Sequence, residues 1–374
     1  MHHPAKVEFP LGNRGFKSHR LRQASQSDNE RWEVELVAKP RVVVHIGPMK
    51  TGTTALGAYF STANRAGILP PSVVYPMDEL WFPAAGNITK HGQLADYLYP
   101  EGRHNSGRKT EFRTPDQVEA MVAHLAAEAS KRGGKDATVV FISETLEGRP
   151  HPDRMAKLLT TYFSDVTLVL AVRSPVEAAR SLLVHKIKDW KSDQVTFDLF
   201  GMLKESDGSL SFDYDNILTR WRGFKGVNVV LTPYFEDESD GYAVVDRFMN
   251  IVTGADATRL GDDFGSRRIH PSLPLSSLQR LISLKKLKLR VERIGFLAEI
   301  VHRVFLRTLF TDRDKVVRAG FGARSAESGD WVITGDERAR ILSLYGDLGA
   351  VLRAKLGKDA TKPEWRAWFE SAGL

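Results

Sequence analysis

The chain has 374 residues, with 53 Lys and Arg against 46 Asp and Glu, which gives a formal net charge of +7 at pH 7. It contains no cysteine, so disulfide bonds and thiolate chemistry are excluded. Charges of both signs are interspersed, and no motif combines aromatic with basic residues. This composition suits an anionic small molecule and gives no indication of nucleic-acid binding.

The first 38 residues predict an N-terminal arm. Residues 1–38 are polar and contain glycine and serine, which is typical of a loosely held segment. Residues 1–30 lack the apolar stretch of a signal peptide. No run in the chain approaches the roughly 18 apolar residues of a membrane-spanning helix. Because cysteine is also absent, we expect a cytoplasmic protein.

Residues 42–54 carry the strongest local signal in the sequence. Residues 42–46 are almost continuously β-branched, which predicts a strand buried on both faces of a parallel sheet. Gly47 ends the strand, Gly52 allows a close backbone approach, and Thr53 opens a helix. Free N–H groups and the positive end of the helix dipole meet at such a turn. With Lys50 in reach, the segment predicts a phosphate-type anion site.

Four more strands are predicted along the chain, at 72–75, 138–143, 166–172 and 227–232. Helical patterns are predicted at 53–63, 116–131, 153–163, 175–187, 213–224 and 241–252. Strands that alternate with helices predict an α/β fold with a central parallel sheet of about five strands, whose carboxyl ends share one edge. We expect a main domain at 39–274 and an all-helical C-terminal subdomain at 275–374.

An irregular insertion at 76–114 interrupts this alternation. A long stretch of poor periodicity in a compact domain is often a binding loop or lid, so we expect part of a substrate site there. Four aromatic residues in it are available to stack on the ring of a bound molecule: Trp81, Phe82, Tyr97 and Tyr99.

A second anion-binding element is predicted after the strand at 166–172. Ser174 suits a helix N-cap and Pro175 the first helical position, so Ser181 falls on the second turn of that helix. Arg173 then ends the strand, at the sheet edge where open parallel sheets bind ligands. An arginine fork and a serine hydroxyl there predict a second phosphate subsite. The alternative is a surface arginine that merely ends a strand.

Together, these two segments resemble the sulfotransferases that use 3′-phosphoadenosine-5′-phosphosulfate (PAPS), most closely bacterial members with an H-I-G-x-x-K-T-G-T-T loop. The resemblance covers about residues 41–273 and implies a P-loop-like sulfotransferase fold. It also implies a 5′-phosphosulfate site in the P-K-[ST]-G-T-T loop, formed by Lys50, Thr51, Gly52, Thr53 and Thr54. The R-x₇-S element, Arg173 and Ser181, is implied to bind the 3′-phosphate.

Two residues depart from the family pattern. Met49 is inserted between the usual neighbours Pro48 and Lys50. Ala55 stands where some members have a tryptophan that stacks on adenine, which leaves the adenine contacts unassigned. The loop also differs from a Walker A motif, in which the lysine follows the second glycine, because here Lys50 precedes Gly52.

Sulfuryl transfer needs a base for the acceptor hydroxyl and a cation for the leaving phosphate. Lys50 is the expected cation, and with the helix N-terminus it makes a metal unnecessary. Glu144 ends the strand at 138–143, and the resemblance to heparan-type relatives implies that it is the base. His91 is the alternative base, because it lies in the insertion at 76–114, where we expect part of the acceptor site, and because cytosolic relatives use histidine.

Two basic segments follow the main motifs. Arg268 lies in a turn-rich segment that either closes over a phosphate or forms a basic surface loop. Residues 280–307 hold eight Lys or Arg and two Glu, a net charge of +6, on a helical pattern of apolar residues. Such a stretch either packs its apolar face on the domain or contacts an anionic membrane or acidic glycan.

The sequence therefore predicts a PAPS-dependent sulfotransferase that modifies a hydroxyl, on a saccharide or glycolipid. A P-loop kinase is an alternative, although the loop order differs and no Walker B aspartate follows 138–143. A nucleotide-binding protein without catalysis is the other alternative, because Met49 alters the loop.

Overall fold

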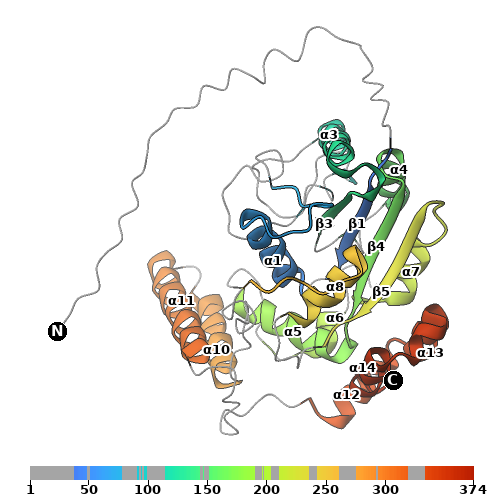
Figure 1. Ribbon diagram of the computed structural model, residues 1–374. Coiled ribbons are helices and arrows are strands. Elements are labelled where there is room, and N and C mark those ends of the chain that lie inside the picture. Colours follow the sequence, from blue (N-terminus) through green and yellow to red (C-terminus); the bar gives the residue numbers. More distant parts are fainter. Residues whose placement is uncertain are drawn as a thin grey trace, which may run out of the picture. The chain divides into compact units, whose positions relative to one another are not determined.

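A five-stranded, all-parallel β-sheet lies at the centre of the fold in the computed structural model (Figure 1). Its spatial order is β2-β3-β1-β4-β5. The strands are β1 Arg41–Gly47, β2 Val73–Val74, β3 Thr138–Ile142, β4 Asp165–Val172 and β5 Val227–Pro233. The predicted α/β fold with a parallel sheet of about five strands is confirmed, and each strand lies where the apolar runs predicted it.

The structure describes part of the chain, and the residues it describes belong to a unit spanning Leu36–Leu374. These residues are 38–48, 51–77, 91, 94, 97–98, 114–143, 146, 151–189, 196, 198–203, 210–235, 242–260, 275–291, 294–318 and 333–374. The predicted arm and most of the insertion at 76–114 lie outside them.

Helices account for most of the remaining described chain. In the sheet region they are α1 Thr53–Arg65, α3 Pro115–Gly133, α4 Pro152–Tyr162, α5 Pro175–Lys188, α6 Leu199–Leu203, α7 Tyr214–Trp221 and α8 Ala243–Thr253. Those that follow are α10 Leu275–Val291, α11 Gly295–Arg318, α12 Gly335–Ser343, α13 Leu348–Leu356 and α14 Pro363–Ala372. Two short 3₁₀ helices span Gly134–Asp136 and Gly357–Thr361. None of the helices described here is long and apolar enough to cross a membrane.

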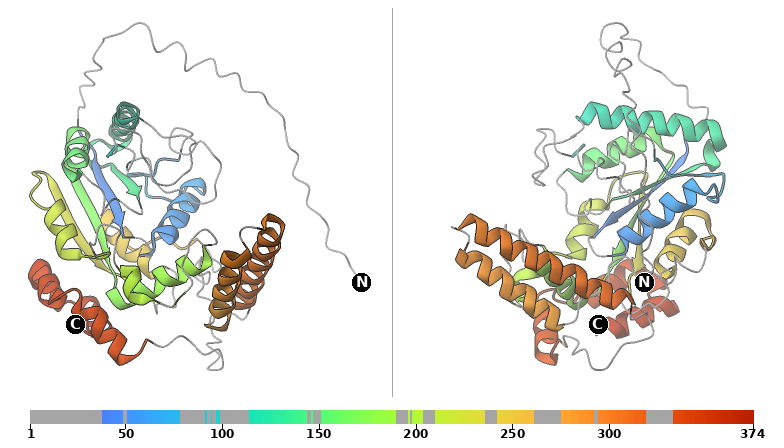
Figure 2. Two further views of the ribbon diagram at one scale, coloured as in Figure 1. Left: turned by 180° about the vertical axis from the view of Figure 1, so that it is seen from behind. Right: turned by 90° about the vertical axis from the view of Figure 1, so that its left-hand side faces the viewer.

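The helices cover both faces of the sheet, and the alternation of side chains along β1 shows how. Val43 belongs to a core formed with α1 and α8. Val42 and Val44 belong to the opposite core, which includes side chains of α3, α4, α5 and α7. Figures 1 and 2 show the resulting layers from several sides. The prediction that this strand is buried on both faces is confirmed.

The carboxyl ends of the strands meet at one edge of the sheet because every pair is parallel. The chain leaves β1 for β2 and β3 on one side, and later continues to β4 and β5 on the other. Open α/β sheets bind ligands beyond the carboxyl ends of the strands, where the strand order reverses in this way. The chain segments after β1 and β4 therefore lie at the position where this fold class holds a ligand.

Candidate anion-binding site

The loop after β1 delivers the N-terminus of α1 to the carboxyl edge of the sheet. Gly52 occupies the N-cap position with φ 85°, and no side chain of the described residues caps this helix. The Thr51 hydroxyl donates a hydrogen bond to the Pro48 carbonyl at 2.6 Å, which closes the turn. The first turn of α1 holds no acidic residue. The N–H groups of this turn and the positive end of the helix dipole remain available for an anion. Lys50 itself lies outside the described residues.

The side chain of Thr53 adds a hydroxyl to this helix N-terminus. Thr53 is only 2% exposed, and its Oγ1 has no hydrogen-bond partner among the residues that the structure describes. A buried hydroxyl without a hydrogen-bond partner lowers the stability of the fold by about 1–3 kcal/mol. An anion at the helix N-terminus would accept its hydrogen bond, and so the donor set fits a phosphate or sulfate group. Thr54 is partly exposed beside it.

Gly52 is packed too closely for a side chain. A Cβ atom built on Gly52 would lie 2.7 Å from Val244 Cγ2 and 3.4 Å from Tyr234 Cε2. Real Cβ atoms essentially never approach another heavy atom as closely as 2.7 Å. The loop is thus packed against α8 and against the residue that follows β5.

Arg173 lies at the carboxyl end of β4, as predicted, and is 3% exposed. Its backbone is fixed by Tyr214, whose hydroxyl accepts from the Arg173 N–H at 2.8 Å and donates to the Arg173 carbonyl at 3.1 Å. The Arg173 guanidinium carbon lies 5.3 Å from the centroid of the Tyr234 ring. Because Tyr234 also packs next to Gly52, a single aromatic ring lies between the two predicted phosphate-binding elements.

Helix α5 begins directly after Arg173. Ser174 is its N-cap residue and Pro175 its first residue, as predicted, but the Ser174 side chain makes no capping hydrogen bond. Its Oγ is buried and has no partner within the described part of the chain. Ser181 falls on the second turn and is partly buried. The start of α5 therefore resembles that of α1 in its uncapped helix N-terminus and buried hydroxyl, and differs from it by an acidic residue in the first turn, Glu177, which pairs with Arg180.

The end of β3 contributes a third hydroxyl. Ser143 directly follows the strand, and its N–H donates to the His45 carbonyl at 2.9 Å. The Ser143 hydroxyl is buried and, among the described residues, has no hydrogen-bond partner. Glu144, the expected base, is the next residue and lies outside the described residues. The buried hydroxyls of Ser143 and Ser174, without partners among the described residues, and the contacts of Tyr234 were not predicted from the sequence.

His91 is buried beside the end of β3, with both ring nitrogens hydrogen-bonded. Its Nδ1 accepts from the Ile142 N–H at 2.9 Å, which leaves Nε2 to donate to the Pro76 carbonyl at 3.2 Å. Burial lowers the pKa of His91 to about 4. The lone pair on Nδ1 of this neutral ring is already engaged in a hydrogen bond, so it is poorly placed to take a proton from a substrate hydroxyl. This geometry favours a structural role for His91 over that of a general base.

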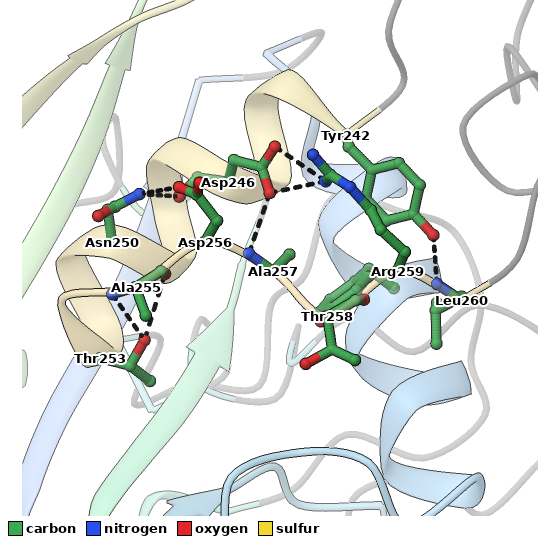
Figure 3. Close-up of polar contacts among 11 residues, drawn as sticks. Tyr242, Asp246, Asn250, Thr253, Ala255, Asp256, Ala257, Thr258, Arg259 and Leu260 are labelled. Carbon is green, nitrogen blue, oxygen red and sulfur yellow. Dashed lines mark hydrogen bonds and ion pairs between the residues drawn. The ribbon is translucent and has the colours of Figure 1, made fainter.

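A polar cluster fixes the segment that leads toward Arg268 (Figure 3). Arg259 binds both carboxylate oxygens of Asp246 at 2.8 and 2.9 Å, and the Ala257 N–H donates to Asp246 Oδ1 at 2.9 Å. The Tyr59 hydroxyl, from α1, donates to the Thr258 carbonyl at 3.2 Å. Residues 257–260 are therefore attached to both α1 and α8. Arg268 lies outside the described residues.

The structure thus brings Thr51, Gly52, Thr53 and Thr54 to the same sheet edge as Arg173, the residue that leads into the Ser181 helix. Within the described ranges, no three His, Asp or Glu side chains converge in a way that could hold a metal ion. No protein-family model matches the chain, and a search of curated proteins found no match. The two uncapped helix N-termini beside a buried arginine are consequently the observation from which a function is inferred.

Proposed function

We propose that the protein is a PAPS-dependent sulfotransferase, which moves a sulfuryl group from PAPS to an acceptor hydroxyl. The observation that carries the proposal is the pair of uncapped helix N-termini, each with a buried hydroxyl, at neighbouring strand ends beside the buried Arg173. Two such elements suit a ligand with two separate anionic groups. PAPS has this property, because it carries a 5′-phosphosulfate and a 3′-phosphate.

In this proposal the loop before α1 holds the 5′ end of PAPS. The backbone N–H groups from Thr51 to Thr54 and the Thr53 hydroxyl donate to its phosphosulfate oxygens, and Lys50 adds a positive charge. The dipole of α1 favours the same charge distribution. Glycine is needed at position 52 for two reasons. Its φ of 85° is a left-handed backbone conformation, and a Cβ atom there would collide with Val244.

The segment after β4 holds the 3′-phosphate in this proposal. Arg173 donates from its guanidinium, and Ser181 donates from the second turn of α5. Ser174 is a further donor, since its buried hydroxyl has no partner among the described residues. Arg268 is proposed to reach the same phosphate from the segment that follows the Asp246–Arg259 cluster.

Bound PAPS supplies the sulfuryl group, and the chain supplies a base and a positive field. Glu144 takes the proton of the acceptor hydroxyl at its carboxylate, at the end of β3. His91 fixes that strand end, because its Nδ1 holds the Ile142 N–H. Lys50 and the α1 N-terminus meet the charge that develops on the leaving phosphate, so we propose that no metal takes part. The proposed acceptor is a saccharide or glycolipid hydroxyl.

Isothermal titration calorimetry with two nucleotides tests the binding mode. Adenosine 3′,5′-bisphosphate carries the 3′-phosphate, and adenosine 5′-monophosphate lacks it. Arg173→Ala is expected to weaken the binding of the bisphosphate by about ten- to a hundredfold, the equivalent of roughly 1.5–3 kcal/mol. It is expected to leave the binding of the monophosphate nearly unchanged. Arg173→Lys serves as a second variant that keeps the charge, and thermal melts verify that both fold. An equal loss for both nucleotides would contradict the role of Arg173.

Transfer from labelled PAPS to glycan, lipid and phenol acceptors tests the chemistry. Sulfation of a glycan or glycolipid is the expected result. Tight binding of ATP with Mg²⁺ but not of PAPS would identify a kinase instead. Binding of PAPS without turnover on any acceptor would identify a nucleotide-binding protein.

A further inference from the structure

Helices α10 and α11 form a hairpin that is joined through residues 292–294 (Figure 2). Away from this connection, one side of the hairpin is buried. Leu278, Leu281 and Phe305 belong to the same core as the sheet and α5. Lys285 is buried as well, and its Nζ donates to the Lys186 carbonyl at the end of α5 at 2.6 Å. The hairpin is thus anchored at one end.

The other end of the hairpin exposes apolar side chains. Every large hydrophobic side chain that is strongly exposed in the described part of the chain lies on this hairpin, with exposed fractions between 43% and 67%. They are Leu287, Leu289, Ile294, Phe296, Ile300 and Val304. Phe296, the most exposed of them at 67%, lies two residues after the connection. A cluster of this kind marks an interaction surface.

Basic side chains alternate with these apolar ones along the hairpin. Six Lys or Arg between positions 276 and 309 are exposed or partly exposed, against one acidic residue among the described positions of that stretch, Glu299, which pairs with Arg303. They are Arg280, Lys286, Lys288, Arg290, Arg303 and Arg307. On α11 the spacing places Phe296 and Ile300 on one side, and Arg303 and Arg307, each seven residues further on, fall on the same side.

We propose that the connecting end of this hairpin, residues 286–291 and 294–307, inserts its exposed side chains into the surface of a lipid bilayer with anionic headgroups. A bilayer offers a negatively charged surface directly above an apolar layer, which matches apolar side chains flanked by cations. A second copy of the chain is a poorer occupant, because a two-fold contact would bring the same basic side chains together. The helices lie in the interface and do not span the membrane.

This inference is independent of the proposed nucleotide site. None of its residues belongs to that site, and both α10 and α11 follow the segment that carries Arg268. Failure of one proposal therefore leaves the other standing, provided that nucleotide binding and lipid binding are measured on the same variants.

Co-sedimentation of the full chain with vesicles tests the proposal. Vesicles of equal parts phosphatidylserine and phosphatidylcholine are compared with vesicles of phosphatidylcholine alone. Binding is expected to the first and not to the second, and is expected to weaken as salt is added, because the Debye length shortens. Absence of binding to the anionic vesicles would overturn the proposal.

One double variant and a matched control test where on the chain the vesicles bind. Lys286→Gln/Arg307→Gln is expected to lose on the order of 25-fold in vesicle affinity, about fivefold for each basic side chain. The matched control Lys157→Gln/Lys225→Gln removes the same charge from exposed positions on α4 and before β5, and should bind as the parent does. Equal losses in both variants would mean that net charge alone drives binding, and would overturn the proposal.

Phe296→Gln/Ile300→Gln tests the apolar part and should weaken vesicle binding by about tenfold or more. Circular dichroism melts verify that these surface variants fold, and calorimetry with adenosine 3′,5′-bisphosphate should give parent-like affinity. Light scattering tests the other occupant. A dimer that this double variant abolishes, in a chain that does not bind vesicles, would assign the surface to a second copy.

Discussion

Replacing Gly52 by alanine would disturb the loop between β1 and α1 in two ways. Its backbone is left-handed, with φ 85° and ψ 1°. In addition, an added Cβ atom would lie 2.7 Å from Val244 Cγ2 and 3.3 Å from Val244 Cγ1. The two effects have different causes and can be separated with a second glycine.

Gly254 provides the matched comparison. It ends α8 with φ 76° and ψ 10°, and a Cβ atom there would meet no described atom within 4 Å. Gly254→Ala should therefore carry only the left-handed backbone cost, about 1–2 kcal/mol. Gly52→Ala should carry that cost and a further 1–3 kcal/mol or so for overpacking. The expected difference in the free energy of unfolding between the two variants is then about 1–3 kcal/mol.

Urea unfolding at neutral pH measures both variants. Val244→Ala removes both methyl groups that the new Cβ atom would meet, so the double variant Gly52→Ala/Val244→Ala should recover about 1–2 kcal/mol relative to additivity. Calorimetry on the same proteins should show that Gly52→Ala weakens the binding of adenosine 3′,5′-bisphosphate and that Gly254→Ala does not. The packing argument fails if Gly52→Ala is no more destabilising than Gly254→Ala, or if Val244→Ala recovers nothing.

Three further substitutions test the site and its surroundings. Thr53→Val keeps the side-chain shape but removes a buried hydroxyl without a described partner, so the ligand-free protein should gain about 1 kcal/mol while bisphosphate affinity falls about tenfold; a lower melting temperature would contradict this. Glu144→Gln should lower turnover by ~10²–10⁴ with PAPS affinity nearly intact, whereas His91→Asn should retain turnover where it is folded; the reverse would make His91 the base. Burial lowers the pKa of His91 to about 4, whereas the unfolded chain has a pKa of about 6.5 for this residue. The stability that neutral His91 contributes is therefore fully present above pH 6.5 or so. It is lost as the pH falls toward 4, by about 3 kcal/mol in all. Urea titrations at several pH values should show a steeper acid loss in the parent than in His91→Gln, and equal slopes would refute the argument.

The fold was predictable because its signals are local. Continuous β-branched residues marked β1, and a serine followed by proline marked the start of α5. Parallel pairing then required the ends of β1 and β4 to share an edge, so the position of Arg173 followed from the strand order. The five-residue helix α6 was not predicted, because it is too short to display helical periodicity.

The remaining site features depend on partners that are distant in the sequence. The capping bond expected of Ser174 does not form, and only the folded structure shows that its hydroxyl has no partner among the described residues. His91 resembled a base in a loop, but its ring is held by Ile142 and Pro76, 51 and 15 residues away. Tyr234 lies between Gly52 and Arg173 only because β5 pairs with β4.

The two ends of α5 have opposite electrostatic surroundings. Its first turn is uncapped and contains the carboxylate of Glu177, whereas a carbonyl of its last turn accepts a hydrogen bond from the ammonium group of Lys285. The helix has 14 residues and is therefore about 20 Å long. Over that distance, the Coulomb interaction of Lys285 with a unit charge near Ser174 is about 0.8 kcal/mol at an effective dielectric constant of about 20. Because one continuous helix joins the two ends, we expect a displacement of the α10–α11 hairpin to move the start of α5, next to Arg173, as well.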